Sequence, residues 1–119
     1  MFTLPIKAGW YHMILHGYKK EEYREIKPYY TIRFKKLFGC ERLSEKEFVE
    51  LLKSNPEKYR TKMVFRNGYS KDSPSSEVDA TLCAGEGNPD WGAQKDTPYY
   101  ILKINSLKEL VPANPSEEM

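Results

Sequence analysis

Gly17 separates a helical pattern of residues from an extended one, and this change constrains how the N-terminal part of the chain can fold. Residues 8–16 carry apolar side chains at i, i+3 and i+4, which is the spacing of one helix face. These side chains are Trp10, Met13 and Ile14. Glycine adopts the left-handed conformation that ends helices without steric cost. Because successive side chains of a strand alternate, Glu22 and Arg24 are expected on one face of the strand that follows.

The charged residues after Gly17 are the first candidate for a functional site. Lys19 lies at the predicted turn, close in sequence to Glu22 and Arg24. An ammonium, a carboxylate and a guanidinium that line one cleft could hold a ligand or move a proton. The competing interpretation is a solvated surface, which is where charged side chains are usually found.

Two helices are expected between this turn and the middle of the chain. Pro28 fits the first turn of a helix that Gly39 ends, although residues 29–34 could instead form a strand. A second helix is predicted over residues 44–54, because Ser44 and Glu47 have the spacing of a capping box.

Strands are predicted over several short apolar runs. These runs are residues 2–6, 62–66, 77–83 and 99–104, with a brief closing element over 107–111. Pro5 lacks an N–H group, so the first strand should lie at a sheet edge or begin a strand. Polar, Gly- and Pro-containing stretches predict loops over 69–76 and 84–97.

This distribution of elements favours an α+β fold, in which strands form a small sheet or barrel and about three helices pack at its side. The 119 residues are enough for one modest core, and no internal repeat is visible. We therefore predict a single domain over residues 1–111 and a disordered tail over 112–119.

The charge distribution bears on the partner. Residues 1–71 carry an excess of eight positive charges and residues 72–119 an excess of six negative charges, which gives +2 overall. The basic part favours a polyanion such as RNA. No apolar run is long enough to span a membrane and no signal peptide is visible, so a cytoplasmic protein without a membrane partner is expected.

Metal and thiol chemistry is not expected. His12 and His16 have a spacing that can bind zinc, but the sequence offers no third ligand beside them. Cys40 and Cys83 stand alone, which predicts free thiols and no disulfide. The sequence therefore predicts neither a metal site nor a cofactor.

Aromatic residues could stack on the bases of single-stranded RNA. Tyr69 is the first choice, because it follows Arg66 and Asn67 at the start of a polar loop, and these three residues are predicted to bind the ligand. Other candidates are Tyr23, Tyr29, Tyr30 and Trp91. The loop 85–92 could approach a phosphate through its glycines, or it could be a shaped connection whose Trp91 caps the core.

Gly17, Lys19, Glu22 and Arg24 match the pattern G-x-K-x-x-E-x-R, which resembles the signature of ASCH domains, relatives of PUA domains. Other stretches resemble small ASCH proteins of bacteria and their phages, namely 23–29, 65–69, 85–92 and 99–104. The resemblance covers most of the chain; the helix at 44–54 is less typical. It implies a PUA-like β-barrel with a cleft beside the signature.

Two functions follow from this resemblance. In a module that binds RNA or a modified nucleotide, Lys19 and Arg24 would contact phosphate or carbonyl groups, and Glu22 would accept from an amine or orient Arg24. Alternatively, some ASCH proteins are amidohydrolases that act on N4-acetylcytidine, and others are described as ribonucleases. Lys19 and Glu22 would then be catalytic, with Glu86 or Asp90 as a third group.

The amidohydrolases use a threonine at the position of Glu22, which argues against their reaction here. A third possibility is a structural or partner-binding protein whose polar cleft is vestigial. The sequence leaves open whether the protein is an enzyme.

Overall fold

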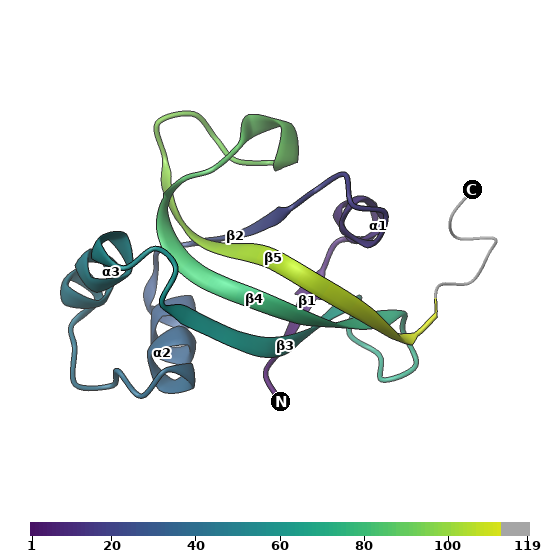
Figure 1. Ribbon diagram of the computed structural model, residues 1–119, viewed down its shortest axis with the longest axis horizontal. Helices are drawn as coiled ribbons and strands as arrows, with labels where there is room; N and C mark the ends of the chain where they lie inside the picture. Colours follow the sequence, from purple (N-terminus) through teal and green to yellow (C-terminus); the bar gives the residue numbers. More distant parts are fainter. Residues whose placement is uncertain (113–119) are drawn as a thin grey trace. The chain divides into compact units, whose positions relative to one another are not determined.

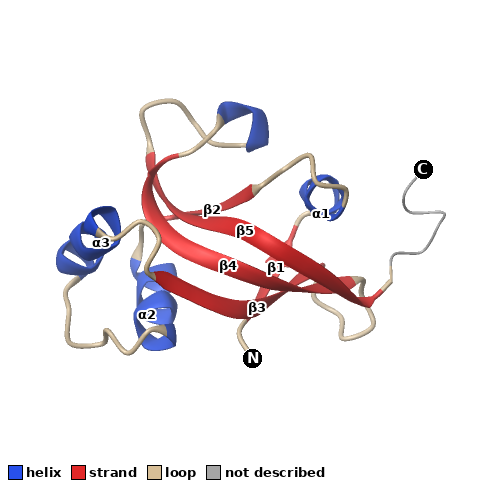
Figure 2. Ribbon diagram, viewed as in Figure 1, coloured by secondary structure: helices blue, strands red, loops and turns tan. Residues whose placement is uncertain are grey.

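The computed structural model describes residues 1–112, and its elements are shown in Figures 1 and 2. In chain order they are β1 (Thr3–Ile6), α1 (Ala8–Leu15), β2 (Glu21–Glu25), α2 (Pro28–Leu37), α3 (Glu45–Ser54), β3 (Tyr59–Asn67), β4 (Ser75–Glu86), a 3₁₀ turn (Pro89–Trp91) and β5 (Pro98–Val111). The tail predicted over 112–119 lies, except for its first residue, outside the described residues.

The five strands form one mixed sheet in the order β1-β3-β4-β5-β2. Together with the helices they give the α+β fold that the sequence predicts. The chain forms two compact units. Among the described residues, the first unit holds 1–20, 61–80 and 104–112, and the second unit holds 21–60 and 81–103. The long strands β3, β4 and β5 contribute residues to both units.

In the first unit, β1 runs parallel to β3, from Thr3 opposite Val64 to Ile6 opposite Asn67. Because β1 is the last strand in the sheet order, Pro5 lies on an edge strand, as predicted.

The buried face of α1 differs from the predicted one. Tyr11 and Ile14 are buried, whereas Trp10 and Met13 are only half-buried. Tyr11 can enter the core because its hydroxyl forms a hydrogen bond of 2.9 Å with the Ser76 hydroxyl, which satisfies its polar end.

In the second unit, β2 runs antiparallel to β5, with Glu21 opposite Lys103 and Glu25 opposite Tyr99. Residues 28–37 form the helix α2, so the alternative of a strand there is wrong. The capping box of α3 is confirmed. Ser44 Oγ accepts from the Glu47 N–H at 3.1 Å, and Ser44 N–H donates to Glu47 Oε1 at 2.9 Å.

Three strands are longer than the sequence predicts. β3 begins at Tyr59, β4 continues to Glu86, and β5 includes the closing element predicted over 107–111. A Cβ atom on Gly85 in β4 would only touch the Ile101 side chain, at 3.9 Å, so packing does not require a glycine at this position. The loop predicted over 69–76 is shorter because β4 starts at Ser75, and the loop predicted over 84–97 is shorter because β4 continues to Glu86.

A hydrogen-bond chain joins α2, α3 and β5 in the second unit. Thr31 Oγ1 donates to Glu45 Oε2 at 2.6 Å and lies 2.5 Å from the Tyr100 hydroxyl. Because the Thr31 hydroxyl has one proton, Tyr100 must donate to Thr31. This chain connects both helices, which lie side by side in Figure 2, to the sheet.

Replacing Thr31 with valine is expected to lower the free energy of unfolding by about 1–3 kcal/mol, because a buried hydroxyl of Tyr100 would lose its acceptor. Urea denaturation followed by circular dichroism measures the loss. Thr31→Ser keeps the hydroxyl and is expected to retain most of the stability. Equal losses for both variants would contradict a role for the hydrogen bonds.

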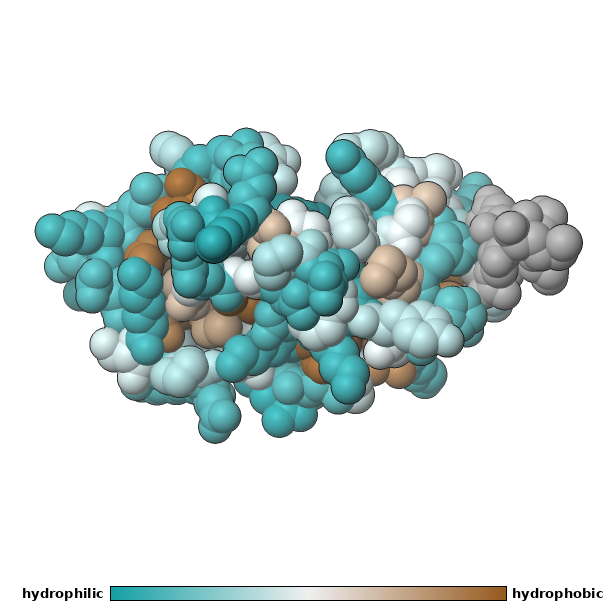
Figure 3. All heavy atoms as spheres, turned by 90° about the horizontal axis from the view of Figure 1, so that it is seen from above, coloured by the Kyte–Doolittle hydropathy of each residue, from teal (hydrophilic) through white to brown (hydrophobic). Residues whose placement is uncertain are grey.

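No helix among residues 1–112 is both long enough and apolar enough to cross a bilayer. The face shown in Figure 3 is largely hydrophilic, and hydrophobic residues show there only as small patches.

Candidate functional site

The turn after α1 positions Lys19. Gly17 has φ +81°, the left-handed conformation expected where the helix ends. The N–H groups of Tyr18 and Lys19 both donate to the Met13 carbonyl, at 2.8 and 3.1 Å. These bonds fold the chain back against the last turn of α1 and fix the backbone of Lys19.

Lys19 is a buried lysine. Its residue is 2% exposed, and its Nζ lies 4.2 Å from the centre of the Trp10 ring. An ammonium group at this distance is attracted by the ring quadrupole. The interpretation of this residue as part of a solvated surface is therefore wrong, and Lys19 departs from the usual exposure of lysine. Lys20, the next residue, is exposed.

Glu22 and Arg24 lie together on β2. Glu22 is 4% exposed; its Oε1 accepts from the Tyr23 N–H at 3.0 Å and lies 3.5 Å from Arg24 Nη1. Arg24 Nη1 also donates to the Tyr23 carbonyl at 2.7 Å. The prediction that Glu22 and Arg24 share one side of a strand is therefore confirmed. The backbone of the residue between them orients both charged groups.

Tyr23 belongs to the core of the second unit. Its hydroxyl donates to Glu21 Oε1 at 2.7 Å and accepts from the Asn88 N–H at 2.8 Å. Burial raises the pKa of Tyr23 far above its usual value, the Asn88 bond opposes the shift, and nearby carboxylates add to it. A Cβ on Gly87 would lie 2.7 Å from the Tyr23 ring, so this glycine permits a close approach.

The loop between β4 and β5 contains the 3₁₀ turn Pro89–Trp91. Asn88 Oδ1 accepts from the Asp90 N–H at 2.9 Å and caps the 3₁₀ turn. Trp91 packs against a buried cluster. This cluster consists of Tyr23, Cys83, Ala93, Tyr99 and Ile101. Of the two interpretations of this loop, the structure favours the one in which Trp91 covers the core. Glu86 and Asp90 are exposed.

Arg66, Asn67 and Tyr69 belong to the first unit. Tyr69 is 88% exposed, which leaves its ring accessible to a ligand. Asn67 lines a shallow hollow of about 580 Å³. The other lining residues are Ala8, His12, Ser70, Asp72, Ser73 and Pro74.

Two buried nitrogen atoms have no hydrogen-bond partner among the described residues, namely Arg66 Nε and His12 Nδ1, and His12 is one of the residues that line this hollow. From the sequence, His12 was considered as a zinc ligand, and a structural or solvent-facing role was preferred. Its place in the hollow depends on the loop after β3, which the Asn67 N–H closes by donating to the Pro74 carbonyl at 2.8 Å. No sequence pattern predicts that closure.

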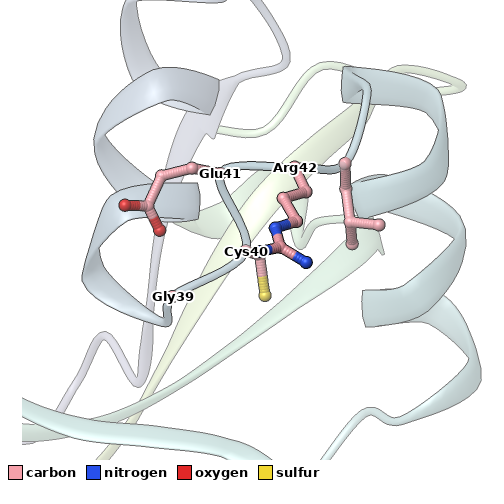
Figure 4. A pocket seen from close by; sticks show the side chains of 5 residues that line it. Gly39, Cys40, Glu41 and Arg42 are labelled. Atoms are coloured by element: carbon pink, nitrogen blue, oxygen red, sulfur yellow. The ribbon is translucent and has the colours of Figure 1, made fainter.

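No group of three His, Cys, Asp or Glu residues that could hold a metal occurs among residues 1–112. Cys40 and Cys83 are free thiols, and burial raises the pKa of Cys83. Cys40 lines a second hollow, of about 400 Å³, in the turn from Gly39 to Leu43 (Figure 4). In that view Cys40 and Arg42 point to the same side, and Glu41 points away.

The structure thus brings Glu22 and Arg24 together in the second unit and places Lys19 against Trp10 in the first. The prediction that all three line one cleft stays a prediction. No protein-family model, curated protein or solved structure matches the chain.

Proposed function

We propose that this chain is an ASCH-like binding module for RNA or a modified nucleotide, and that Lys19, Glu22 and Arg24 supply its main polar contacts. The observation that carries the proposal is the burial of Lys19 and Glu22, which are 2% and 4% exposed. Lys20 and Glu25 belong to the same charged segment but are exposed, so composition alone does not explain this burial.

Burial of ionic groups is poorly explained by stability. Removing an ion from water costs several kcal/mol, about as much as a well-placed partner returns, and apolar replacements are often as stable. Buried charged groups are instead a common feature of sites that bind or transform a ligand. The burial of Lys19 and Glu22 therefore supports a functional role for both residues.

The chemistry of the three groups suits a nucleotide. Lysine and arginine donate to phosphate or carbonyl oxygens, and a carboxylate accepts from an exocyclic amine. The Tyr23 carbonyl holds Arg24, and the Tyr23 N–H holds Glu22, so both groups are oriented before a ligand arrives. Such preorganisation lowers the entropy lost on binding.

The same contacts favour binding over hydrolysis. Glu22 Oε1 already accepts from a backbone N–H and lies beside a guanidinium, which suits an oriented acceptor more than a mobile proton carrier. We therefore keep hydrolysis as an outcome of the test and not as the proposal.

The proposal is tested by binding of single-stranded RNA and of N4-acetylcytidine to the full chain at two salt concentrations. Lys19→Met and Glu22→Gln preserve side-chain size and are expected to weaken binding of at least one of these ligands roughly tenfold or more. Lys20→Met is the matched control, because it removes an exposed neighbouring charge, and it should bind nearly as the wild type does. Thermal unfolding confirms that each variant is folded.

Two results would overturn the proposal. The folded wild type could bind neither ligand at either salt concentration, or Lys19→Met and Glu22→Gln could bind as tightly as Lys20→Met. Release of acetate from N4-acetylcytidine or cleavage of RNA, lost in Lys19→Met, would replace the binding module with a hydrolase.

A further inference from the structure

The outer side of α2 presents exposed aromatic, aliphatic and basic side chains in one row. These are Tyr29, Ile32, Arg33 and Lys36, here called the outer α2 face, and they follow the i, i+3, i+4, i+7 spacing of one helix side. Tyr29 is 55% exposed and Ile32 is 61% exposed. Solvation accounts for the two cations of this face but not for the two large apolar side chains beside them.

Arg33 is fixed in place on this face. Its Cζ lies 3.6 Å from the centre of the Tyr29 ring, and its Nη1 donates to the Tyr29 carbonyl at 2.7 Å. A guanidinium carries five N–H donors, so most of them remain for a ligand. The stacked pair therefore offers an exposed aromatic ring and an oriented cation without further ordering.

The alternation of rings and cations continues from the outer α2 face toward β2. The Tyr30 ring lies perpendicular to the Tyr29 ring, with centres 4.9 Å apart. Lys27 Nζ and Arg24 Cζ lie 5.5 and 5.9 Å from the centre of the Tyr30 ring. Arg24 is one of the residues of the proposed nucleotide contact, so the row connects that contact with the outer α2 face.

We propose that the outer α2 face binds the single-stranded RNA that extends from the nucleotide held at Arg24. Arg33 and Lys36 contact phosphates, and Tyr29 and Ile32 contact unpaired bases. This inference rests on the proposed function and adds a second surface to it. Bases are accessible to aromatic side chains only where the strand is unpaired, which favours single-stranded over duplex RNA.

Charge complementarity supports a nucleic acid as the occupant. Residues 28–37 include three basic residues and no Asp or Glu. The acidic group nearest in sequence, Glu25, lies 3.9 Å from Lys27 Nζ and so faces a cation. A positive row interleaved with rings is the arrangement that single-strand binders use along a nucleic-acid backbone.

Binding of a trinucleotide and of an RNA of about 12 nucleotides tests this inference. For Arg33→Gln/Lys36→Gln, we expect the longer RNA to bind roughly tenfold more weakly, with a salt slope smaller by about 1.4 for two lost phosphate contacts. Trinucleotide affinity should stay nearly unchanged. Lys46→Gln/Lys53→Gln is the matched control, because it removes two exposed cations from the neighbouring α3 and should leave both affinities unchanged.

Tyr29→Ala tests the aromatic contribution without a change of charge. It is expected to weaken binding of the longer RNA about 5- to 100-fold, the range found for loss of one stacked base. Binding of heparin, a polyanion without bases, should not change in this variant. Unchanged RNA binding by Tyr29→Ala would overturn the stacking role, and an equal effect of the α3 control would overturn the assignment to α2.

Failure of this inference is distinguishable from failure of the proposed function. If the trinucleotide binds in a manner that needs Lys19 and the longer RNA binds no tighter, the outer α2 face is not an RNA surface and the nucleotide contact stands. If neither RNA binds to the folded wild type, both proposals are overturned.

Discussion

Replacing Phe34 with alanine is expected to lower the free energy of unfolding by about 3–5 kcal/mol, the usual loss for a buried phenylalanine. Phe34 is fully buried on the inner side of α2. Its ring lies perpendicular to Tyr100, with centres 5.2 Å apart, and stacks with Tyr30 at 6.2 Å. The substitution removes both contacts and leaves a cavity between α2 and β5. Urea denaturation measures the loss.

Ile32→Ala is the control on the same helix. Ile32 is two residues away on the outer α2 face and is mostly exposed, so its truncation is expected to change the stability by less than about 0.5 kcal/mol. A loss for Ile32→Ala as large as that for Phe34→Ala would contradict the assignment of the two faces. It would also remove Ile32 from the outer α2 face as we define it.

Phe34 and Ile32 distinguish the side of α2 that stabilises the fold from the side that is free to bind a partner. The inner side of α2 joins the core through Thr31 and Phe34, and its burial explains why this segment is a helix. The outer side makes no such contribution, yet it keeps a tyrosine and an isoleucine in water. For large apolar side chains that stay mostly exposed beside cations, an external partner is the better explanation.

Local signals predicted the local structure well. The capping box at Ser44 and Glu47 fixes the start of α3 through two hydrogen bonds within four residues, so the sequence alone was sufficient. The same holds for Gly17 and for the shared side of Glu22 and Arg24, which depend on backbone geometry over a few residues.

Non-local structure was predicted less well. The length of β5 depends on neighbouring strands, and its polar end up to Val111 carries no strand pattern of its own. The parallel pairing of β1 with β3 joins residues some sixty positions apart. Periodicity within a short segment predicts neither such a pairing nor the order of the strands in the sheet. The face of α1 was misjudged for a related reason, because the partner that allows Tyr11 to be buried is Ser76.

The candidate site shows the same division. Sequence spacing identified Lys19 as a candidate. Its burial could not be predicted from the neighbouring residues, because lysine side chains are usually exposed. From the sequence, Tyr29 was named as a candidate for stacking on bases but was not connected with the basic residues of the same helix. A usable signal existed, since Tyr29 and Arg33 are four residues apart and such pairs meet on a helix.

The protein is expected to lose stability steeply in alkaline solution because three tyrosines are buried in the folded state. Burial raises the pKa of Tyr11, Tyr23 and Tyr100 above the ordinary value. In Tyr11 and Tyr100 a side-chain hydrogen bond opposes the shift and a carboxylate adds to it, from Glu109 and Glu45 respectively. The three side chains therefore keep their protons in the folded protein at a pH at which the unfolded chain loses them.

The sign follows from the protons bound in each state. Above about pH 10 the unfolded tyrosines ionise while the folded ones do not, so the unfolded state binds fewer protons and stability falls as pH rises. Each tyrosine contributes about 1.4 kcal/mol per pH unit, which makes about 4 kcal/mol per pH unit for the three together. Below about pH 9 this contribution is constant, because neither state ionises there.

Urea denaturation between about pH 8 and about pH 11 measures this slope, and phenolate absorbance reports ionisation. Tyr100→Phe should reduce the slope by about a third, whereas Tyr69→Phe, which changes an exposed tyrosine, should leave it unchanged. Ionisation of all nine tyrosines near their ordinary pKa, with the protein still folded, would contradict the burial of these three hydroxyls. Cooperative appearance of their phenolate absorbance together with unfolding is the expected result, since each hydroxyl must reach water before it can ionise.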